Sequence, residues 1–185
     1  MISVENVNKR FPKYPITVED KGWIYGVWYC GTAWQKSKIY GQYPPKFLER
    51  ALALFPEIPS NKILHCPSGS VTGPGMTVDL IKDDVRCPQI CASADSLPFA
   101  NSSFKLWLAD PPYSEEDAKK YGCKKFPLVG MVREAQRVLE PGGYLGVLHL
   151  YYPSYSRKIW ELKALIAVIT GFNRATRIFS ILQKK

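Results

Sequence analysis

Short apolar runs alternate along the chain with polar segments rich in proline and glycine. Five of these runs have the length and the flanking turn residues of buried strands, at 63–66, 76–80, 87–92, 104–109 and 144–150. Two more strands are expected at 165–170 and 177–182. The link between them is short, so they are predicted to form an antiparallel pair.

Apolar positions at helical spacing predict helices over 43–54 and 127–139, the first led by prolines. A short helix is expected after Ser114, and another over 154–160. Residues 1–20 contain Pro12 and Pro15 without clear periodicity, which indicates an irregular arm. The aromatic residues of 22–34 suggest one or two short strands. Their rings either pack on a sheet edge, the favoured interpretation, or form a wall of a ligand pocket.

Strands that alternate with helices indicate an α/β domain with a mostly parallel sheet, whose ligands bind at the carboxyl ends of the strands. The run 104–109 ends abruptly at Asp110-Pro111-Pro112-Tyr113. Proline cannot continue the ladder, so the chain must turn there. A carboxylate, a fixed backbone carbonyl and an aromatic ring can together grip a planar group that bears an amino group.

This tetrapeptide resembles the Asp-Pro-Pro-Tyr motif of amino-methyltransferases, which use S-adenosylmethionine to methylate exocyclic amines of nucleic-acid bases. The resemblance implies a Rossmann-like class I methyltransferase fold: a mostly parallel seven-stranded sheet with an antiparallel C-terminal edge and, here, a short first crossover. It assigns catalysis to Asp110, Pro111, Pro112 and Tyr113. By family analogy, Asp before the prolines favours adenine over cytosine.

Other segments resemble the cofactor-binding motifs of the same enzymes. The start of the first helix resembles motif X, and the glycine-rich loop after the first strand resembles motif I, with His65 in place of the usual acid and Val71 in place of a glycine. The resemblance implies ribose binding by an acid after the second strand and adenine binding by the Ala-Asp-x-Leu-Pro-Phe segment. The implied cofactor residues are Tyr43, Pro44, His65, Cys66, Pro67, Ser68, Gly69, Asp79, Leu80, Asp95, Ser96 and Leu97.

The net charge of +9 and the isoelectric point of about 9.3 favour a polyanionic partner. Residues 151–185 contain seven of the basic residues against a single acid, Glu161. The charge agrees with the nucleic-acid partner that the resemblance implies, with DNA favoured and RNA as the other choice. One domain over 1–185 is expected, with an aromatic arm over 1–40 and no separate target-recognition domain. Either specificity is then low, or a homodimer or another partner supplies it, or the substrate is single-stranded or RNA.

Composition also argues against several classes of protein. There is no apolar run of about 18 residues, so no membrane span is expected. The polar start lacks the apolar core of a signal peptide, and five scattered cysteines indicate reduced thiols in a cytoplasmic protein. Cys87 and Cys91 form a pair, but no second pair with ligand spacing follows, so no metal site is expected.

The function predicted from these patterns is transfer of a methyl group from S-adenosylmethionine to an exocyclic amine, with adenine in DNA as the first choice. One alternative is a non-catalytic partner that binds cofactor or nucleic acid for another methyltransferase. A further alternative is a methyltransferase that acts on RNA or on an amine outside nucleic acids.

Overall fold

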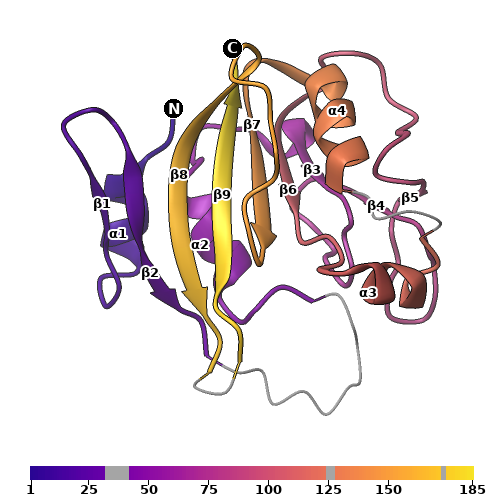
Figure 1. The fold of residues 1–185 in the computed structure, drawn as a ribbon, viewed down its shortest axis with the longest axis horizontal. Coiled ribbons are helices and arrows are strands. Elements are labelled where there is room, and N and C mark those ends of the chain that lie inside the picture. Colours follow the sequence, from indigo (N-terminus) through magenta and orange to yellow (C-terminus); the bar gives the residue numbers. More distant parts are fainter. Residues whose placement is uncertain (32–41, 124–127, 172–173) are drawn as a thin grey trace.

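The computed structural model of the chain describes residues 1–31, 42–123, 128–171 and 174–185. They form one mixed sheet in the order β1-β2-β8-β9-β7-β6-β3-β4-β5 (Figure 1). The strands are β1 (Ile16–Val18), β2 (Ile24–Tyr29), β3 (Ile63–His65), β4 (Met76–Asp79), β5 (Ile90–Cys91), β6 (Phe104–Ala109), β7 (Leu139–His149), β8 (Trp160–Ile169) and β9 (Arg177–Lys184). The helices are α1 (Val4–Arg10), α2 (Phe47–Ala53), α3 (Glu115–Lys120) and α4 (Leu128–Val138), with a 3-10 turn at Ser60–Lys62.

The seven strands from β3 to β9 confirm the predicted fold class. Strands β5, β4, β3, β6 and β7 run parallel to one another, while β9 lies antiparallel between β7 and β8. The loop that connects β3 to β4 contains no helix, as the short first crossover predicted. Parallel strands place their carboxyl ends at one edge of the sheet, and this edge is where the predicted motifs follow the strands.

The N-terminal region differs from the prediction. Residues 1–20 are not irregular, because they contain α1 and β1, and the sheet has two more strands than the seven expected. The Ser3 hydroxyl caps α1, and the Asn8 side chain makes two hydrogen bonds of 2.8 Å with the backbone of Ile16. These side-chain contacts hold short elements that periodicity alone does not reveal. Strand β2 was predicted, and it adds in parallel to β8.

The helix predicted over 154–160 is wrong. These residues contain a turn, and β8 begins at Trp160. Trp160 is buried in the core, and the amide N–H of Lys185 donates to the Ile159 carbonyl at 2.8 Å. The segment therefore joins the sheet, where its large apolar residues are buried by partners far along the chain.

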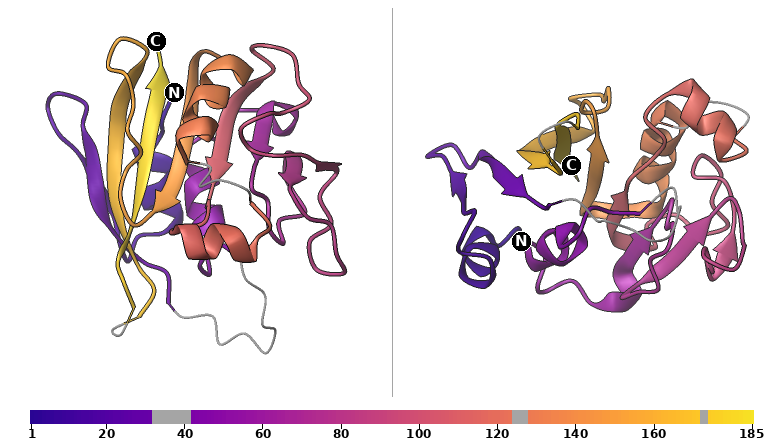
Figure 2. Two further views of the ribbon diagram at one scale, coloured as in Figure 1. Left: turned by 45° about the vertical axis from the view of Figure 1, so that its right-hand side comes forward. Right: turned by 90° about the horizontal axis from the view of Figure 1, so that it is seen from below.

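Helices cover the two faces of the sheet unequally. Helices α1 and α2 lie on one face, and α4 lies on the other against the β6–β7 part (Figure 2). Within the described ranges no helix covers the β2–β8–β9 part of the α4 face (Figure 1). None of the helices in these ranges is long and apolar enough to cross a membrane.

Candidate active site

The site is built around the end of β6, which is buried on both faces of the sheet. Its residues from Leu106 to Ala109 are at most 1 % exposed, so the strand position is strongly constrained. Pro111 and Pro112 follow and are buried, and they turn the chain away from the ladder. The result is that the Asp110 side chain projects at the carboxyl edge of the sheet with only 10 % of its surface exposed.

Two groups contact the Asp110 carboxylate. The Tyr113 hydroxyl donates to Oδ1 at 2.5 Å, and the Arg177 guanidinium lies 3.8 Å from Oδ2. Burial raises the pKa of Asp110 to about 6, and the charge of Arg177 and the hydrogen bond from Tyr113 oppose this rise. Asp110 is therefore mainly ionised at neutral pH. It becomes protonated when the pH falls by about one unit, to about 6.

Tyr113 lies between Arg177 and His149. The guanidinium carbon of Arg177 is 5.1 Å from the centre of the Tyr113 ring, and the His149 ring meets it edge-on at 5.1 Å. His149 Nε2 is 3.2 Å from the Pro112 carbonyl oxygen, so this ring also supports the motif. Burial raises the pKa of Tyr113 well above its ordinary value, and the nearby Asp110 charge adds to this, so the hydroxyl stays protonated.

A cavity of about 410 Å³ opens beside Asp110. This volume lies within the usual range for sites that bind small molecules, about 300–1,000 Å³. All four residues of the Asp-Pro-Pro-Tyr motif line it. The predicted cofactor residues among the lining are Tyr43, Pro44, Cys66, Pro67, Gly69, Asp79 and Leu80. The structure therefore brings the catalytic motif and most of the predicted cofactor residues together around one space.

The glycine-rich loop after β3 is fixed by Asp79 and His65. The Gly69 N–H donates to Asp79 Oδ2 at 2.8 Å, and the Ile81 N–H approaches Oδ1 at 3.4 Å. His65 is fully buried, and its Nε2 lies 2.8 Å from the Pro74 carbonyl oxygen. Burial lowers the pKa of His65, which favours the neutral ring. His65 thus ties the two ends of the loop together, and Asp79 lines the cavity.

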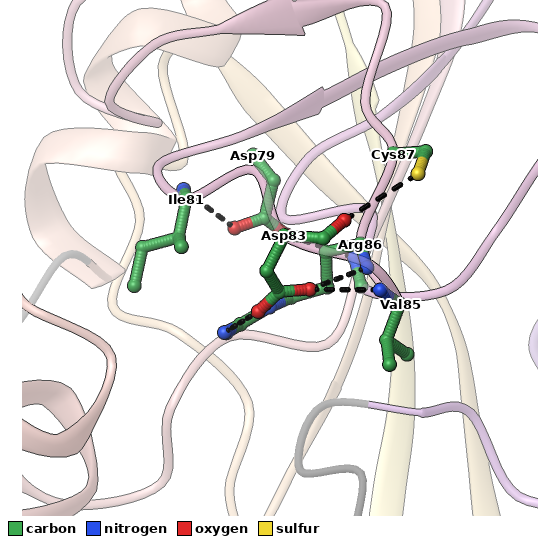
Figure 3. Close-up of polar contacts among 7 residues, drawn as sticks. Asp79, Ile81, Asp83, Val85, Arg86 and Cys87 are labelled. Carbon is green, nitrogen blue, oxygen red and sulfur yellow. Dashed lines mark hydrogen bonds and ion pairs between the residues drawn. The ribbon is translucent and has the colours of Figure 1, made fainter.

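The loop from β4 to β5 contributes Leu80 and Arg86 to the cavity lining, and its polar contacts are drawn in Figure 3. Asp83 organises it by accepting from the backbone N–H groups of Val85 and Arg86, at 3.0 and 2.7 Å, and by pairing with the Arg86 guanidinium. These contacts, led by the Arg86 side chain, lower the pKa of Asp83 to about 2. Arg86 itself lines the cavity, so this loop holds a cation near Asp79.

Five predicted cofactor residues lie outside the cavity lining: His65, Ser68, Asp95, Ser96 and Leu97. Asp95 is exposed and accepts a hydrogen bond of 2.6 Å from the Ser93 hydroxyl. Leu97 is buried in the core, and its N–H donates to Glu134. The neighbouring residues 92–94 line the cavity instead. The cofactor roles of the five residues remain predictions.

The aromatic stretch 22–34 is described only up to Gly31. Trp28 is fully buried and packs against Phe47 and Phe179, with ring centres 6.1 and 5.9 Å apart. In the described part, Gly31 is the residue of this stretch that lines the cavity. The favoured packing interpretation therefore holds for Trp28, while Trp34 and Tyr40 lie outside the described residues.

Several cavity residues were not singled out from the sequence for this site. Arg86, Thr170, Arg174 and Arg177 all line it. Arg177 had a usable signal, because it begins the strand predicted to be antiparallel. The amino end of an antiparallel strand lies at the edge where its parallel neighbours end. Thr170 gave no comparable signal, since it is a single polar residue after an apolar strand.

Solved structures resemble this fold at low sequence identity. TrmN from Thermus thermophilus has a TM-score of 0.52 and 19% identity over 78% of this chain, which spans only 50% of that protein. The inferred methyltransferase yhhF from Escherichia coli has a TM-score of 0.53 and 14% identity, with 84% and 96% of the two chains covered. The chain has the Rossmann-like fold of class I methyltransferases.

Other comparisons add little to the fold. An inferred methyltransferase from Streptococcus mutans, solved in complex with SAH, aligns with a TM-score of 0.46 and 10% identity over 69% of this chain and 89% of that one. No protein-family model matches the sequence, and no curated protein matches it. The likeness to TrmN and yhhF is one of fold.

Proposed function

We propose that this chain transfers a methyl group from S-adenosylmethionine to an exocyclic amino group of a nucleic-acid base, with adenine as the first candidate. The observation that carries the proposal is the buried Asp110 carboxylate, which lies next to Tyr113 at the mouth of the cavity. The arrangement disfavours a non-catalytic partner, since burying a carboxylate costs desolvation energy and such a partner has no reaction that needs one.

The cavity residues fit the cofactor. Asp79 offers a carboxylate suited to a ribose diol, and the backbone of the Gly69 loop approaches the cavity closely. Two buried hydroxyls of lining residues, those of Tyr43 and Thr170, have no hydrogen-bond partner among the described residues. Such groups are ready to bind a polar ligand. When bound, S-adenosylmethionine supplies an electrophilic methyl group.

The chain's own residues prepare the amine for attack. An exocyclic amine is a weak nucleophile because its lone pair is shared with the ring. Asp110 and the Pro111 carbonyl would accept its two hydrogens, which favours a tetrahedral nitrogen. The amine would replace the Tyr113 hydroxyl on Oδ1, and the Tyr113 ring is then available to stack on the base. Arg177 helps to keep Asp110 ionised.

The test is transfer of labelled methyl groups to nucleic-acid pools. Purified chain would be incubated with radiolabelled S-adenosylmethionine and separate pools of single-stranded RNA, single-stranded DNA and duplex DNA, followed by nucleoside analysis. Label in N-methylated adenosine or deoxyadenosine would support the proposal and identify the polymer. Label in N-methylated cytosine would refute the adenine assignment but keep amine transfer to a nucleic-acid base. Label in a carbon-methylated base, or in no pool, would refute amine transfer as well.

The pH dependence of the reaction gives an independent check. The ionised form of Asp110 accepts the amine hydrogens, so kcat/KM should fall about tenfold per pH unit below about 6, the pKa of this carboxyl. The Arg177→Gln variant loses the positive charge that lowers the pKa of Asp110. The fall of kcat/KM on the acid side should therefore move to higher pH. His149→Gln is the control because His149 also titrates nearby, and it should leave the pH of this fall unchanged. If His149→Gln instead shifts the pH at which kcat/KM falls, the assignment of this fall to Asp110 would be wrong.

A further inference from the structure

The uncovered part of the sheet carries a continuous apolar surface, which we call the open face. It is formed by alternate residues of three strands: Tyr25, Val27 and Tyr29 of β2, Leu165, Ala167 and Ile169 of β8, and Ile178 of β9. The register pairs Tyr25 with Leu165, Val27 with Ala167, and Tyr29 with Ile169. The intervening β2 residues, such as Trp28, point the other way into the core below α2.

The open face is most exposed along β2, while its β8 and β9 residues are half-buried. Tyr25, Val27 and Tyr29 are 45 %, 47 % and 37 % exposed, although they lie in the middle of paired strands. Figure 1 shows β2, β8 and β9 with no helix in front of them, while α1 and α2 lie behind. Single exposed apolar residues are ordinary, but a contiguous patch across three strands marks an interaction surface.

One end of the open face leads to the active-site cavity. Gly31 lies two residues after Tyr29, and Thr170 directly follows Ile169, and both line the cavity. From Tyr25 to Gly31 the strand direction spans about 20 Å at the usual rise per residue. A ligand lying along β2 would therefore enter the cavity at the carboxyl ends of β2 and β8.

Basic residues lie at the cavity end of this surface, and their charge indicates the kind of ligand. Residues 151–185, which include β8 and β9, hold seven basic residues against one acid. The exposed Arg174 and the half-buried Arg177 line the cavity, whereas Lys163 of β8 pairs with Glu161 at 2.7 Å. A second copy of a chain with a net charge of +9 would bring like charges together, whereas a polyanion would neutralise them.

The aromatic rings suit the bases of such a polyanion. The Tyr29 ring packs against Tyr14 with centres 6.1 Å apart, and the Lys13 ammonium lies 5.6 Å from the Tyr14 ring. Exposed rings such as those of Tyr25 and Tyr29 are a common means of binding single-stranded nucleic acid, since every base offers a face for stacking. An apolar protein partner would not require this accumulation of positive charge.

We infer that the open face is a platform for a single strand of nucleic acid, which stacks bases on Tyr25 and Tyr29 and directs the strand toward Asp110. The inference rests on the proposed function for its substrate class, but binding to the platform requires neither cofactor nor turnover. It also provides a recognition surface on a chain that has no separate target-recognition domain among its described residues.

The test measures binding of a fluorescent single-stranded oligo-adenylate by anisotropy, without cofactor. Tyr25→Ala/Tyr29→Ala should weaken binding about 100-fold, since each lost stacking partner costs about tenfold. Tyr25→Phe/Tyr29→Phe keeps the rings and should bind within about threefold of the native chain. Val129→Ala, which changes an exposed apolar residue of α4, should have no effect. Adenosine monophosphate, too short to span the platform, should bind all variants equally.

The outcomes separate this inference from the proposed function. Unchanged oligonucleotide affinity in the alanine variant would overturn the platform, even if methyl transfer is observed. Weakened affinity supports it, even if no methyl transfer is found. A second copy of the chain is the other possible occupant of the open face, and sedimentation of the same variants tests it. If the native chain is a dimer and Tyr25→Ala/Tyr29→Ala dissociates it without changing oligonucleotide affinity, the face is a contact between two copies. That result would overturn the inference. Circular dichroism confirms that each variant is folded.

Discussion

Replacing Asp110 by asparagine is expected to lower kcat for methyl transfer by about 100-fold or more, the usual cost of removing one group that stabilises the transition state. Asparagine keeps the shape of the side chain but offers one acceptor oxygen without charge, and its amide group opposes the incoming amine. The carboxylate is buried, so the neutral residue also avoids a desolvation penalty, and the protein should remain folded.

Single-turnover methyl transfer with saturating cofactor is the measurement for Asp110→Asn. Calorimetric titration with S-adenosylhomocysteine should show nearly native affinity, because the change lies on the amine side of the cavity. Glu115→Gln is the control, since Glu115 is an exposed carboxylate in the first turn of α3 outside the cavity lining. If Asp110→Asn kept more than a tenth of the native rate, the proposed role of the carboxylate would be wrong.

The second large effect is expected at Asp79, where Asp79→Asn should weaken cofactor binding about 10- to 100-fold. A hydrogen bond to a charged group contributes about 1.5–3 kcal/mol, which corresponds to this range. The asparagine oxygen can still accept from the Gly69 N–H, so the loop should keep its position. Asp79→Ala removes that bond as well, and it should bind cofactor more weakly than Asp79→Asn.

Calorimetry with S-adenosylmethionine and S-adenosylhomocysteine measures this effect directly. Asp84→Asn is the matched control, because Asp84 is an exposed acid of the same loop and does not line the cavity. Native affinity in Asp79→Ala would mean that the cofactor does not use this carboxylate. The glycine-rich loop, in which His65 and Val71 depart from the pattern of motif I, would then approach the cavity for a reason other than cofactor binding by Asp79.

The agreement between expectation and structure is best where local patterns are strong. Strand β6 was expected over 104–109 and is found at Phe104–Ala109, because an apolar run ending in two prolines has few other solutions. The reversed pair β8 and β9 also follows from a short link between two apolar runs. The positions of Asp110 and Asp79 at the same edge of the sheet follow from parallel strands.

The N-terminal elements and the 154–160 segment were missed because contacts distant in sequence decide them. Asn8 holds β1 through its side chain, and Asn6 bonds the Ala53 carbonyl at 2.6 Å across 47 residues. Trp160 joins a strand because β9 pairs with it through Lys184. Local propensity is weak compared with such packing, so it does not determine these segments.

The sequence alone determined the class of fold, the strand that presents Asp110 and part of the cavity lining. These features depend on apolar periodicity and on prolines and glycines, whose effects act over a few residues. The tertiary structure alone decided that Arg177 contacts Asp110, that Tyr113 donates to it, and that β2 leaves one face uncovered. Those contacts join residues that the order of the strands in the sheet brings together. The hydrophobic pattern along the chain does not encode that order.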